Sequence, residues 1–248
     1  MILCIDSGNS RIKWALHADG AWQESVAVDH AETAKMADLP RRLQMPTHVM
    51  LANVAGDAAG AAIRQALAPW LPVLCAVEST TAAGGVVNLY TDPARLGVDR
   101  WCALIGARAL TAAPCVVVMA GTATTVDTLD GEGRFLGGLI LPGLDLMRRS
   151  LARDTAALPL AAGHYSLHPR CTDDAITSGC IEAQAGAIER ACARLGAGAV
   201  CLLSGGAAGV IGEHLDVPHT LVGNLVLEGL LRLAQADPAV HAAGKTSG

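Results

Sequence analysis

The sequence has few aromatic residues and no cluster of basic ones. Aromatic side chains make up 3% of its 248 residues, and 18 Lys and Arg against 23 Asp and Glu give a net charge of −5. Proteins that bind nucleic acid use aromatic platforms for stacking bases or basic surfaces for phosphates. The composition therefore argues against a nucleic-acid partner and predicts an aliphatic core.

Long apolar runs and an export signal are also lacking. The apolar runs are too short for a membrane span, and Met1 leads into the first of them without the basic stretch and cleavage site of a signal peptide. We therefore expect a cytoplasmic protein that does not associate with membranes. Its 52% hydrophobic and 17% charged residues are typical of a globular chain with one large or two small domains.

The motifs of several enzyme classes are missing as well. No GxGxxG follows a predicted strand, and there is no complete P-loop, no HExxH and no nucleophile elbow. Dinucleotide binding, Walker-type ATP hydrolysis and the common hydrolase mechanisms are thus unsupported. The eight cysteines include no CxxC pair and lie mostly within apolar runs, so we expect buried thiols instead of disulfides or a zinc site.

The opening residues 2–16 predict a β-hairpin whose turn can hold phosphates. An apolar run ends on Asp6, passes through a turn, and resumes as apolar residues that alternate with Lys13. Gly8 lets the backbone approach an anion, Ser7, Asn9 and Ser10 add donors, and a carboxylate at Asp6 can hold Mg²⁺ through water. The alternative is an ordinary hairpin in which Asp6 only caps the turn.

Strands that alternate with helices along the rest of the chain predict an α/β architecture. We predict helices at 31–43, 57–70, 98–110, 144–153, 172–195 and 222–235. Further strands are predicted at 21–28, 47–53, 73–77, 135–141 and 199–203, with a long loop at 80–97 and a looser segment at 155–171. A loop as long as 80–97 is typical of a functional segment.

Residues 115–129 repeat the design of the opening hairpin. Aligning Gly8 with Gly121 places Asn9 against Thr122 and Asp6 against Met119. This weak duplication predicts two similar halves, 1–110 and 111–248, that face each other across a cleft.

The loop at 80–97 leads into Asp99 and Arg100, in the first turn of a predicted helix. Asp99 there is either a ligand-site carboxylate or simply stabilised by the helix dipole. Arg100 at a positive helix end needs an anionic partner, and a ligand carboxylate would provide one. Residues 204–206, Ser-Gly-Gly, follow a predicted strand and either face a nucleotide or form a plain turn.

Four motifs together resemble the type III pantothenate kinases, also called the Bvg accessory factor family. They are Asp6-x-Gly8-Asn9-x-x-x-Lys13, Gly97-Val98-Asp99-Arg100, Gly121-Thr122-Ala123-Thr124-Thr125-Val126-Asp127 and Gly137-Gly138-x-x-x-Pro142-Gly143. Each is modest alone, whereas four in this order are highly specific. The resemblance implies two duplicated actin-like, or ribonuclease H-like, halves, each a mixed sheet with flanking helices, around a central cleft. It also implies ATP-dependent phosphorylation of pantothenate to 4′-phosphopantothenate, the first step of coenzyme A biosynthesis.

The resemblance also implies roles for individual residues. The ATP phosphates would lie against Asp6, Ser7, Gly8, Asn9, Ser10, Arg11, Ile12, Lys13 and Thr122, with Mg²⁺ held by Asp6 through water. Pantothenate would be bound by Tyr90, Gly97, Val98, Asp99, Arg100 and Thr172, with Asp99 as the catalytic base. Thr172 would reach the substrate across a homodimer interface, although Cys171 precedes it where the family usually has Asn.

The chain departs from the family pattern at Met119. Relatives usually carry Asp there, where it binds a monovalent cation such as K⁺ or NH₄⁺, and a thioether cannot replace a carboxylate as ligand of a hard cation. The resemblance therefore predicts kinase activity with ATP and Mg²⁺ and little activation by K⁺. Two rivals stay open, namely a kinase of the same superfamily that acts on another small sugar or acid, and a non-catalytic regulator that retains the fold.

Overall fold

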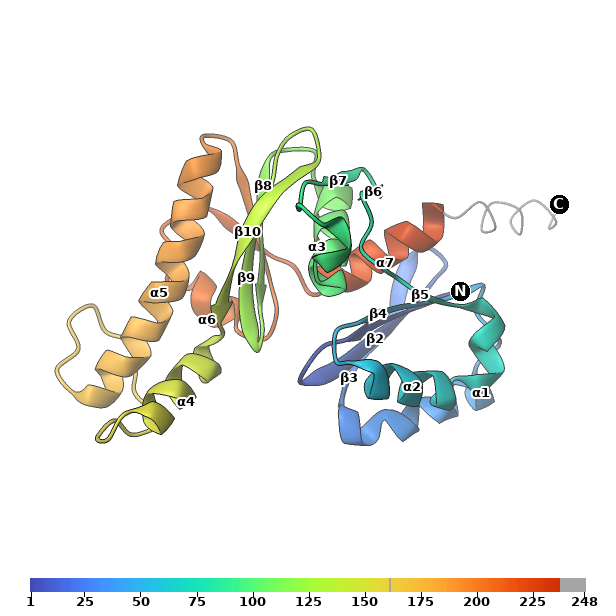
Figure 1. Ribbon diagram of the computed structural model, residues 1–248, viewed down its shortest axis with the longest axis horizontal. Helices are drawn as coiled ribbons and strands as arrows, with labels where there is room; N and C mark the ends of the chain where they lie inside the picture. Colours follow the sequence, from blue (N-terminus) through green and yellow to red (C-terminus); the bar gives the residue numbers. More distant parts are fainter. Residues whose placement is uncertain (161, 237–248) are drawn as a thin grey trace. The chain divides into compact units, whose positions relative to one another are not determined.

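A computed structural model gives the structure of the protein and describes residues 1–160 and 162–236 (Figure 1). The chain forms two compact units. The first holds Met1–Leu110 and the returning chain from Leu225, and the second holds Thr111–Asn224.

The first unit is built on a five-stranded mixed sheet of order β3-β2-β1-β4-β5. Its strands are β1 (Ile2–Ser7), β2 (Arg11–Ala18), β3 (Ala21–Asp29), β4 (His48–Asn53) and β5 (Leu74–Ala76). The first three form antiparallel hairpins, whereas β4 and β5 run parallel to β1. Because parallel strands end at the same edge of a sheet, the turn after β1 lies beside the ends of β4 and β5.

Helices cover both faces of this sheet. One face is covered by the 3₁₀ helix η1 (His30–Asp38), α1 (Leu39–Arg42) and α2 (Asp57–Ala66), whose side chains pack against alternate residues of β1. The other face is covered by α3 (Val98–Leu110) and α7 (Leu225–Ala236), as Figure 1 shows for α7. The alternation of a strand thus directs Leu3 and Ile5 to the first face, and Cys4 and Asp6 to the face of α3.

The last helix joins the first unit because two glycines allow close helix packing. A Cβ atom at Gly106 of α3 would overlap the Leu225 carbonyl, and one at Gly229 of α7 would overlap the Cys102 carbonyl. The backbones therefore approach each other where any other residue would hold them apart. The expected second half, 111–248, differs from the second unit by this helix and by residues 237–248, which lie outside the described residues.

The segment between β5 and α3 is more regular than the expected loop. The 3₁₀ helix η2 (Ala68–Val73) precedes β5, and β6 (Ala82–Ala83) pairs antiparallel with β7 (Val86–Asn88). Gly84 and Gly85 form the turn between them with φ of 57° and 81°, values that favour glycine. The 3₁₀ helix η3 (Pro93–Arg95) then leads into α3.

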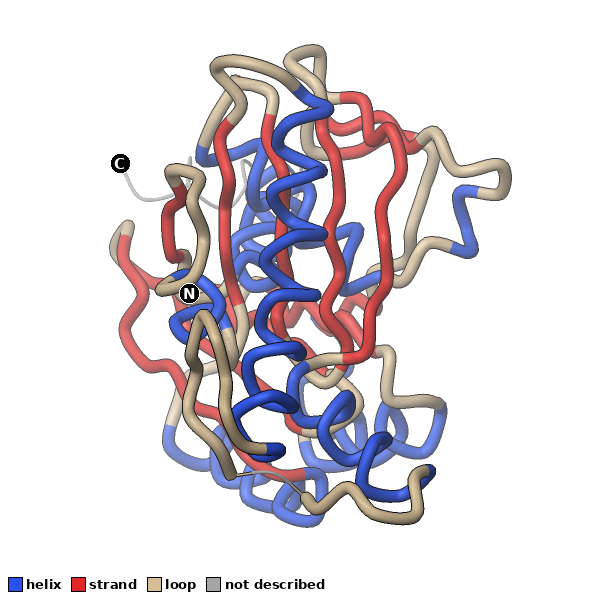
Figure 2. Tube along the Cα trace, turned by 90° about the vertical axis from the view of Figure 1, so that its left-hand side faces the viewer, coloured by secondary structure: helices blue, strands red, loops and turns tan. Residues whose placement is uncertain are grey.

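The second unit contains a mixed sheet in which five strands follow the order β12-β11-β8-β9-β10. They are β8 (Cys115–Ala120), β9 (Ala123–Leu129), β10 (Arg134–Pro142), β11 (Val200–Ser204) and β12 (His219–Leu221). The long helix α5 (Thr172–Leu195) runs along one face of the sheet, as Figure 2 shows, and α4 (Leu144–Asp154) and α6 (Ala208–Gly212) pack with it. The aliphatic core predicted from the composition lies between these helices and the sheet.

The prediction that the cysteines are buried needs correction at two positions. Cys75 and Cys171 are exposed, although the other cysteines are buried or half-buried thiols as expected, and all eight are free. Within the described residues, no helix is both long and apolar enough to cross a membrane.

Candidate functional site

The turn between β1 and β2 brings the predicted phosphate-binding residues together. Asp6 and Ser7 end β1 as buried residues, Gly8 and Lys13 are half-buried, and the tip at 9–11 is exposed. The Ser7 hydroxyl is buried and has no hydrogen-bond partner among the described residues. A buried hydroxyl without a partner is costly unless a ligand or water satisfies it.

Ile12 differs from the other residues of this stretch. Its side chain is fully buried in the core beneath the sheet, so only its backbone can face a ligand. Gly8 shows the opposite situation. Its φ is not left-handed, and a Cβ there would lie 3.5 Å from the Arg11 carbonyl oxygen, an ordinary contact. Nothing inside the described chain requires glycine at this position, which favours a ligand that approaches the backbone closely.

The negative charge of Asp6 is unfavourable because its carboxylate is buried. Burial raises the pKa of Asp6 from its usual 3.8 to about 6, with Lys13 lowering it and Asp99 raising it further. Lys13 lies directly opposite Asp6 in the β1–β2 register. Because Asp99 raises the pKa of Asp6, the carboxylates of Asp6 and Asp99 are close enough to repel each other. A cation between or beside them would relieve this repulsion.

Asp99 is held in place by its neighbours in the first turn of α3. Its Oδ1 accepts the Arg100 backbone N–H at 2.8 Å. A Cβ at Gly97 would lie 2.7 Å from the same oxygen, so only glycine leaves the carboxylate this position. The Gly97 carbonyl also accepts the first helical hydrogen bond, from Trp101 at 3.0 Å. Gly97 and Asp99 thus form one local unit, in agreement with their occurrence in one motif.

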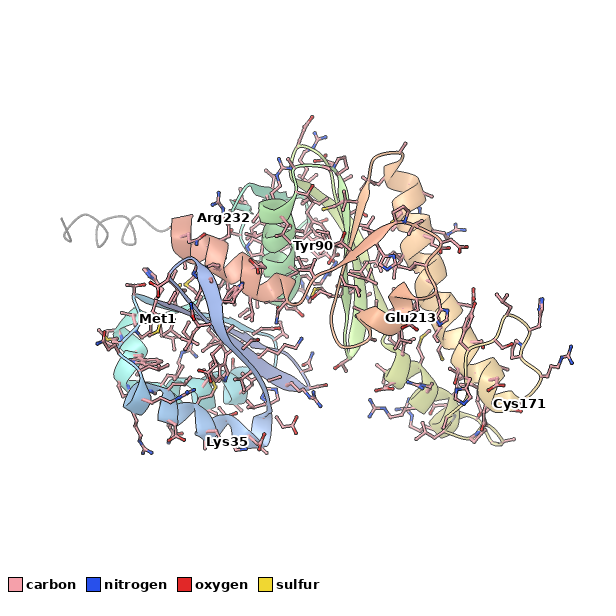
Figure 3. All side chains as sticks on the ribbon, turned by 180° about the vertical axis from the view of Figure 1, so that it is seen from behind. Met1, Lys35, Tyr90, Cys171, Glu213 and Arg232 are labelled. Carbon is pink, nitrogen blue, oxygen red and sulfur yellow. The ribbon has the colours of Figure 1, made fainter. Side chains whose placement is uncertain are left out.

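Arg100 is buried, and Tyr90 meets its guanidinium. The Arg100 Nη1 donates to the Tyr90 hydroxyl at 2.9 Å, and the guanidinium carbon lies 5.6 Å from the ring centroid. Figure 3 labels Tyr90 beside α3. Asn88 positions this tyrosine: its Oδ1 accepts the Tyr90 N–H at 3.1 Å, and its Nδ2 donates to the Pro93 and Thr80 carbonyls at 3.1 and 3.3 Å.

Residues 6–13, Tyr90 and 97–100 all belong to the first unit, and the structure brings Lys13 and Asp99 close enough to Asp6 to shift its pKa. A cavity of about 380 Å³ lies at the carboxyl ends of β4 and β5. Its polar lining comes from Asn53, Asp57, Arg64 and Glu78. Asn53 is paired with Ser7 in the sheet, so the cavity begins next to the phosphate-binding turn.

The remaining predicted residues lie in the second unit. Thr122 is exposed at the β8–β9 turn, which two other loops support. A Cβ at Gly143 would overlap the Gly121 carbonyl, and one at Gly205 would overlap the Ala120 carbonyl. Three glycine-bearing loops, including the Ser-Gly-Gly turn at 204–206, therefore converge at the carboxyl end of β8.

Met119 and Thr172 occupy different parts of this unit. Met119 is half-buried on β8, opposite Thr125, whose hydroxyl is buried and has no hydrogen-bond partner among the described residues. Thr172 is exposed at the first turn of α5. The position of these residues relative to the first unit stays a prediction.

The donor set of the first unit suits Mg²⁺. In residues 1–160 and 162–236, no group of three or more His, Cys, Asp or Glu could hold a metal ion. Mg²⁺ in kinases is bound by one or two carboxylates, with water and substrate phosphates as further ligands. The buried carboxylate of Asp6, whose ionised form a cation would stabilise, meets that requirement.

Sequence reasoning missed two residues that shape the site. His30 contacts the Gly8 carbonyl with its Nε2 at 2.7 Å, and Asn88 holds Tyr90. Both contacts depend on tertiary structure, and only the Gly-Gly turn before Asn88 carried a local signal of the hairpin that positions it.

Comparison with known proteins shows the family of the chain. The family model for type III pantothenate kinase matches residues 2–194. The type III pantothenate kinase of Dechloromonas aromatica is 58% identical over 235 residues, which cover 94% of this chain and 99% of the relative. That of Aromatoleum aromaticum is 51% identical over 241 residues, covering 96% and 100%.

Solved structures agree on the fold. A Baf family protein from Campylobacter jejuni matches with a TM-score of 0.65 and 17% identity, covering 95% of this chain and 98% of that one. Component A of the (R)-2-hydroxyglutaryl-CoA dehydratase of Acidaminococcus fermentans matches with a TM-score of 0.53 and 14% identity, covering 98% of both. The predicted pair of actin-like halves, each a mixed sheet with flanking helices, is thereby confirmed as the fold. By the match to the family model and the identity to its curated members, the chain belongs to the type III pantothenate kinase family.

Proposed function

We infer that this chain is an ATP-dependent pantothenate kinase, which transfers the terminal phosphoryl group of ATP to the hydroxyl of pantothenate in the first step of coenzyme A biosynthesis. The observation that carries the inference is 58% identity to a type III pantothenate kinase over almost the whole of both chains. ATP and pantothenate are then its substrates, and the cytoplasm, where both are found, is its expected location.

The geometry of the first unit supports this reaction. Phosphoryl transfer passes through a loose transition state, so alignment and charge neutralisation supply most of the catalysis. The turn at 6–13 would bind the phosphates through its backbone, the buried Ser7 hydroxyl and Lys13, with Thr122 as a contact from the second unit. Asp6 would hold Mg²⁺, which supplies positive charge at the transferring phosphate.

The substrate end of the site would be formed by the Gly97–Arg100 motif and Tyr90. Asp99 would accept the proton of the attacking hydroxyl, a modest task because little proton transfer is needed before the bond to the leaving group loosens. Arg100, fixed by Tyr90 and buried, would pair with the carboxylate of pantothenate.

Coupled measurement of ADP release tests the proposal. We expect ATP turnover to depend on pantothenate and Mg²⁺, with 4′-phosphopantothenate as product. Turnover with a different small acid or sugar, and none with pantothenate, would favour another kinase of the superfamily. Nucleotide binding without turnover on any acceptor would favour a regulator.

Met119 leads to a prediction about monovalent cations. Its thioether and the neutral Thr125 hydroxyl opposite it do not form a ligand set for a hard cation. We expect turnover to require Mg²⁺ and to differ by less than about twofold between K⁺, NH₄⁺ and Na⁺ at constant ionic strength, since position 119 supplies no carboxylate to select the ion. Steady-state rates in each chloride salt, with a bulky organic cation as control, measure this. A tenfold or larger activation by K⁺ would show that other residues bind the ion.

We also propose a homodimer, on grounds that add to the role of Thr172 implied by the resemblance. The apolar stripes of the 98–110 and 172–195 helices are buried within the chain, so they do not indicate a partner. Instead, β10 exposes Leu136, Leu139 and Ile140, at 51, 41 and 65%. Successive strand residues point to opposite faces, so Leu139 and Ile140 do not share a face, and the more exposed Ile140 marks the face that we propose as the interaction surface. Light scattering should give twice the chain mass of 25.3 kDa, and Ile140→Glu should reduce it to one chain. A wild-type monomer that turns over at micromolar concentration would refute the dimer and the role of Thr172 across it.

A further inference from the structure

His30 contacts the turn that the proposed function assigns to the ATP phosphates. It is the first residue of η1, the helix marked by Lys35 in Figure 3, and its Nε2 lies 2.7 Å from the Gly8 carbonyl oxygen. A carbonyl oxygen has no proton to give, so the ring nitrogen is the donor. Both the neutral Nε2–H tautomer and the imidazolium can make this bond.

The register of the sheet explains why this histidine reaches the turn. Asp29 at the end of β3 is paired with Arg11, the first residue after the turn. The next residue, His30, therefore lies beside the turn and reaches back over it. The Arg11–Asp29 ion pair spans 3.5 Å between side chains that are about two-thirds exposed, and such pairs contribute little. The half-buried His30 bond is the stronger link between β3 and the turn.

This bond fixes the direction of a second group. The peptide between Gly8 and Asn9 is planar and trans, so its N–H points opposite to its carbonyl. With the Gly8 carbonyl held by His30, the Asn9 N–H points away from His30. Glycine before this peptide makes a flip of the plane cheap, because glycine occupies left-handed and right-handed regions almost equally. Without a donor at position 30, the turn can present a carbonyl dipole where an anion needs an N–H.

We propose that His30 is a positioning residue for nucleotide binding, which holds the Gly8–Asn9 peptide so that the Asn9 N–H faces the phosphates of ATP. The inference rests on the proposed function for the role of the turn. It adds a residue outside the four motifs.

The test compares His30→Ala, His30→Gln and His30→Glu with the wild type. The amide nitrogen of Gln can take the place of Nε2 as donor, whereas ionised Glu is similar in size and offers only acceptors. We expect His30→Ala and His30→Glu to weaken ATP binding, measured by calorimetry without pantothenate, about 5- to 30-fold, the worth of one charge-assisted hydrogen bond. In both variants the KM for ATP should rise by a similar factor, whereas the KM for pantothenate should change less than twofold. His30→Gln should bind ATP within about threefold of the wild-type affinity.

The matched control is His17→Ala. His17 is a half-buried histidine of the same hairpin, packed edge-on to Trp22 at a centroid distance of 5.3 Å, at the end opposite the turn. Its replacement should leave ATP affinity unchanged. Circular dichroism checks that each variant folds. If His30→Ala does not fold, the difference in ATP affinity between His30→Gln and His30→Glu tests the inference.

Equal affinities for Gln and Glu at position 30, or His30→Ala within twofold of the wild type, would overturn the inference. A wild type that binds ATP but does not phosphorylate pantothenate would refute the proposed function alone, because the binding measurement needs no acceptor. A wild type that does not bind ATP would overturn both.

Discussion

Replacing Asp99 by asparagine lowers the turnover of pantothenate by about 10²- to 10⁴-fold and leaves nucleotide binding intact. The loss is the usual worth of a positioned general base. The structure makes this substitution mild for the local fold of the first turn of α3. The asparagine oxygen can still accept the Arg100 N–H, and Gly97 leaves room for the side chain. Steady-state rates measure the loss of turnover, and calorimetry measures whether ATP still binds.

A second variant tests whether position matters as well as chemistry. Gly97→Ala retains the Asp99 carboxylate but places a Cβ 2.7 Å from the present position of its Oδ1, so the carboxylate must move. We expect this variant to bind ATP normally and to lose turnover. If Asp99→Asn costs less than about threefold with pantothenate as acceptor, Asp99 is not the base.

Replacing Asp6 by asparagine should raise the stability of the metal-free protein at pH 8 and lower its turnover. The Asp6 pKa is about 6 in the folded protein against a usual 3.8, so folding disfavours its ionised form. Its contribution to the free energy of unfolding is therefore fully present below about pH 4 and is lost as the pH rises through 6. Each pH unit between these values corresponds to about 1.4 kcal/mol, so at pH 8 the charge costs on the order of 3 kcal/mol.

Asparagine carries no charge and avoids this cost. Urea unfolding of the metal-free protein should show Asp6→Asn more stable than the wild type at pH 8, with the difference disappearing near pH 4. Turnover with Mg²⁺ and ATP should fall at least about 100-fold, because the proposed metal-binding carboxylate is gone. Added Mg²⁺ with ATP should raise the unfolding temperature of the wild type much more than that of the variant.

Asp38→Asn is the control for this experiment. Its carboxylate is 67% exposed and pairs with Arg41 at the surface, so its removal should change neither the pH profile nor the rate. A variant Asp6→Asn that is no more stable than the wild type at pH 8 would contradict the burial argument. Retained activity would contradict the role of Asp6 in metal binding.

Local pattern determined much of the secondary structure. The hairpin of β1 and β2 and helix α3 lie where alternation and helical spacing predicted them. The errors have local causes too. The expected helix at 31–43 is a 3₁₀ helix followed by one short turn with Pro40 near its start, and the helix expected at 57–70 is interrupted near Pro69. The hairpin of β6 and β7 was overlooked because its strands have only two and three residues.

The sequence by itself also determined which family the chain resembles, because four short motifs in order identify it without any knowledge of contacts. Tertiary structure alone decided what the motif residues do to one another. Asp6 and Asp99 are 93 positions apart. Their carboxylates repel each other because the Asp6 side chain points to the face of the sheet that α3 covers. The last helix joined the first unit because glycines at 106 and 229 admit close packing. Burial, electrostatic repulsion and a hydrogen bond such as that from His30 to Gly8 depend on distance in space, which no local pattern contains.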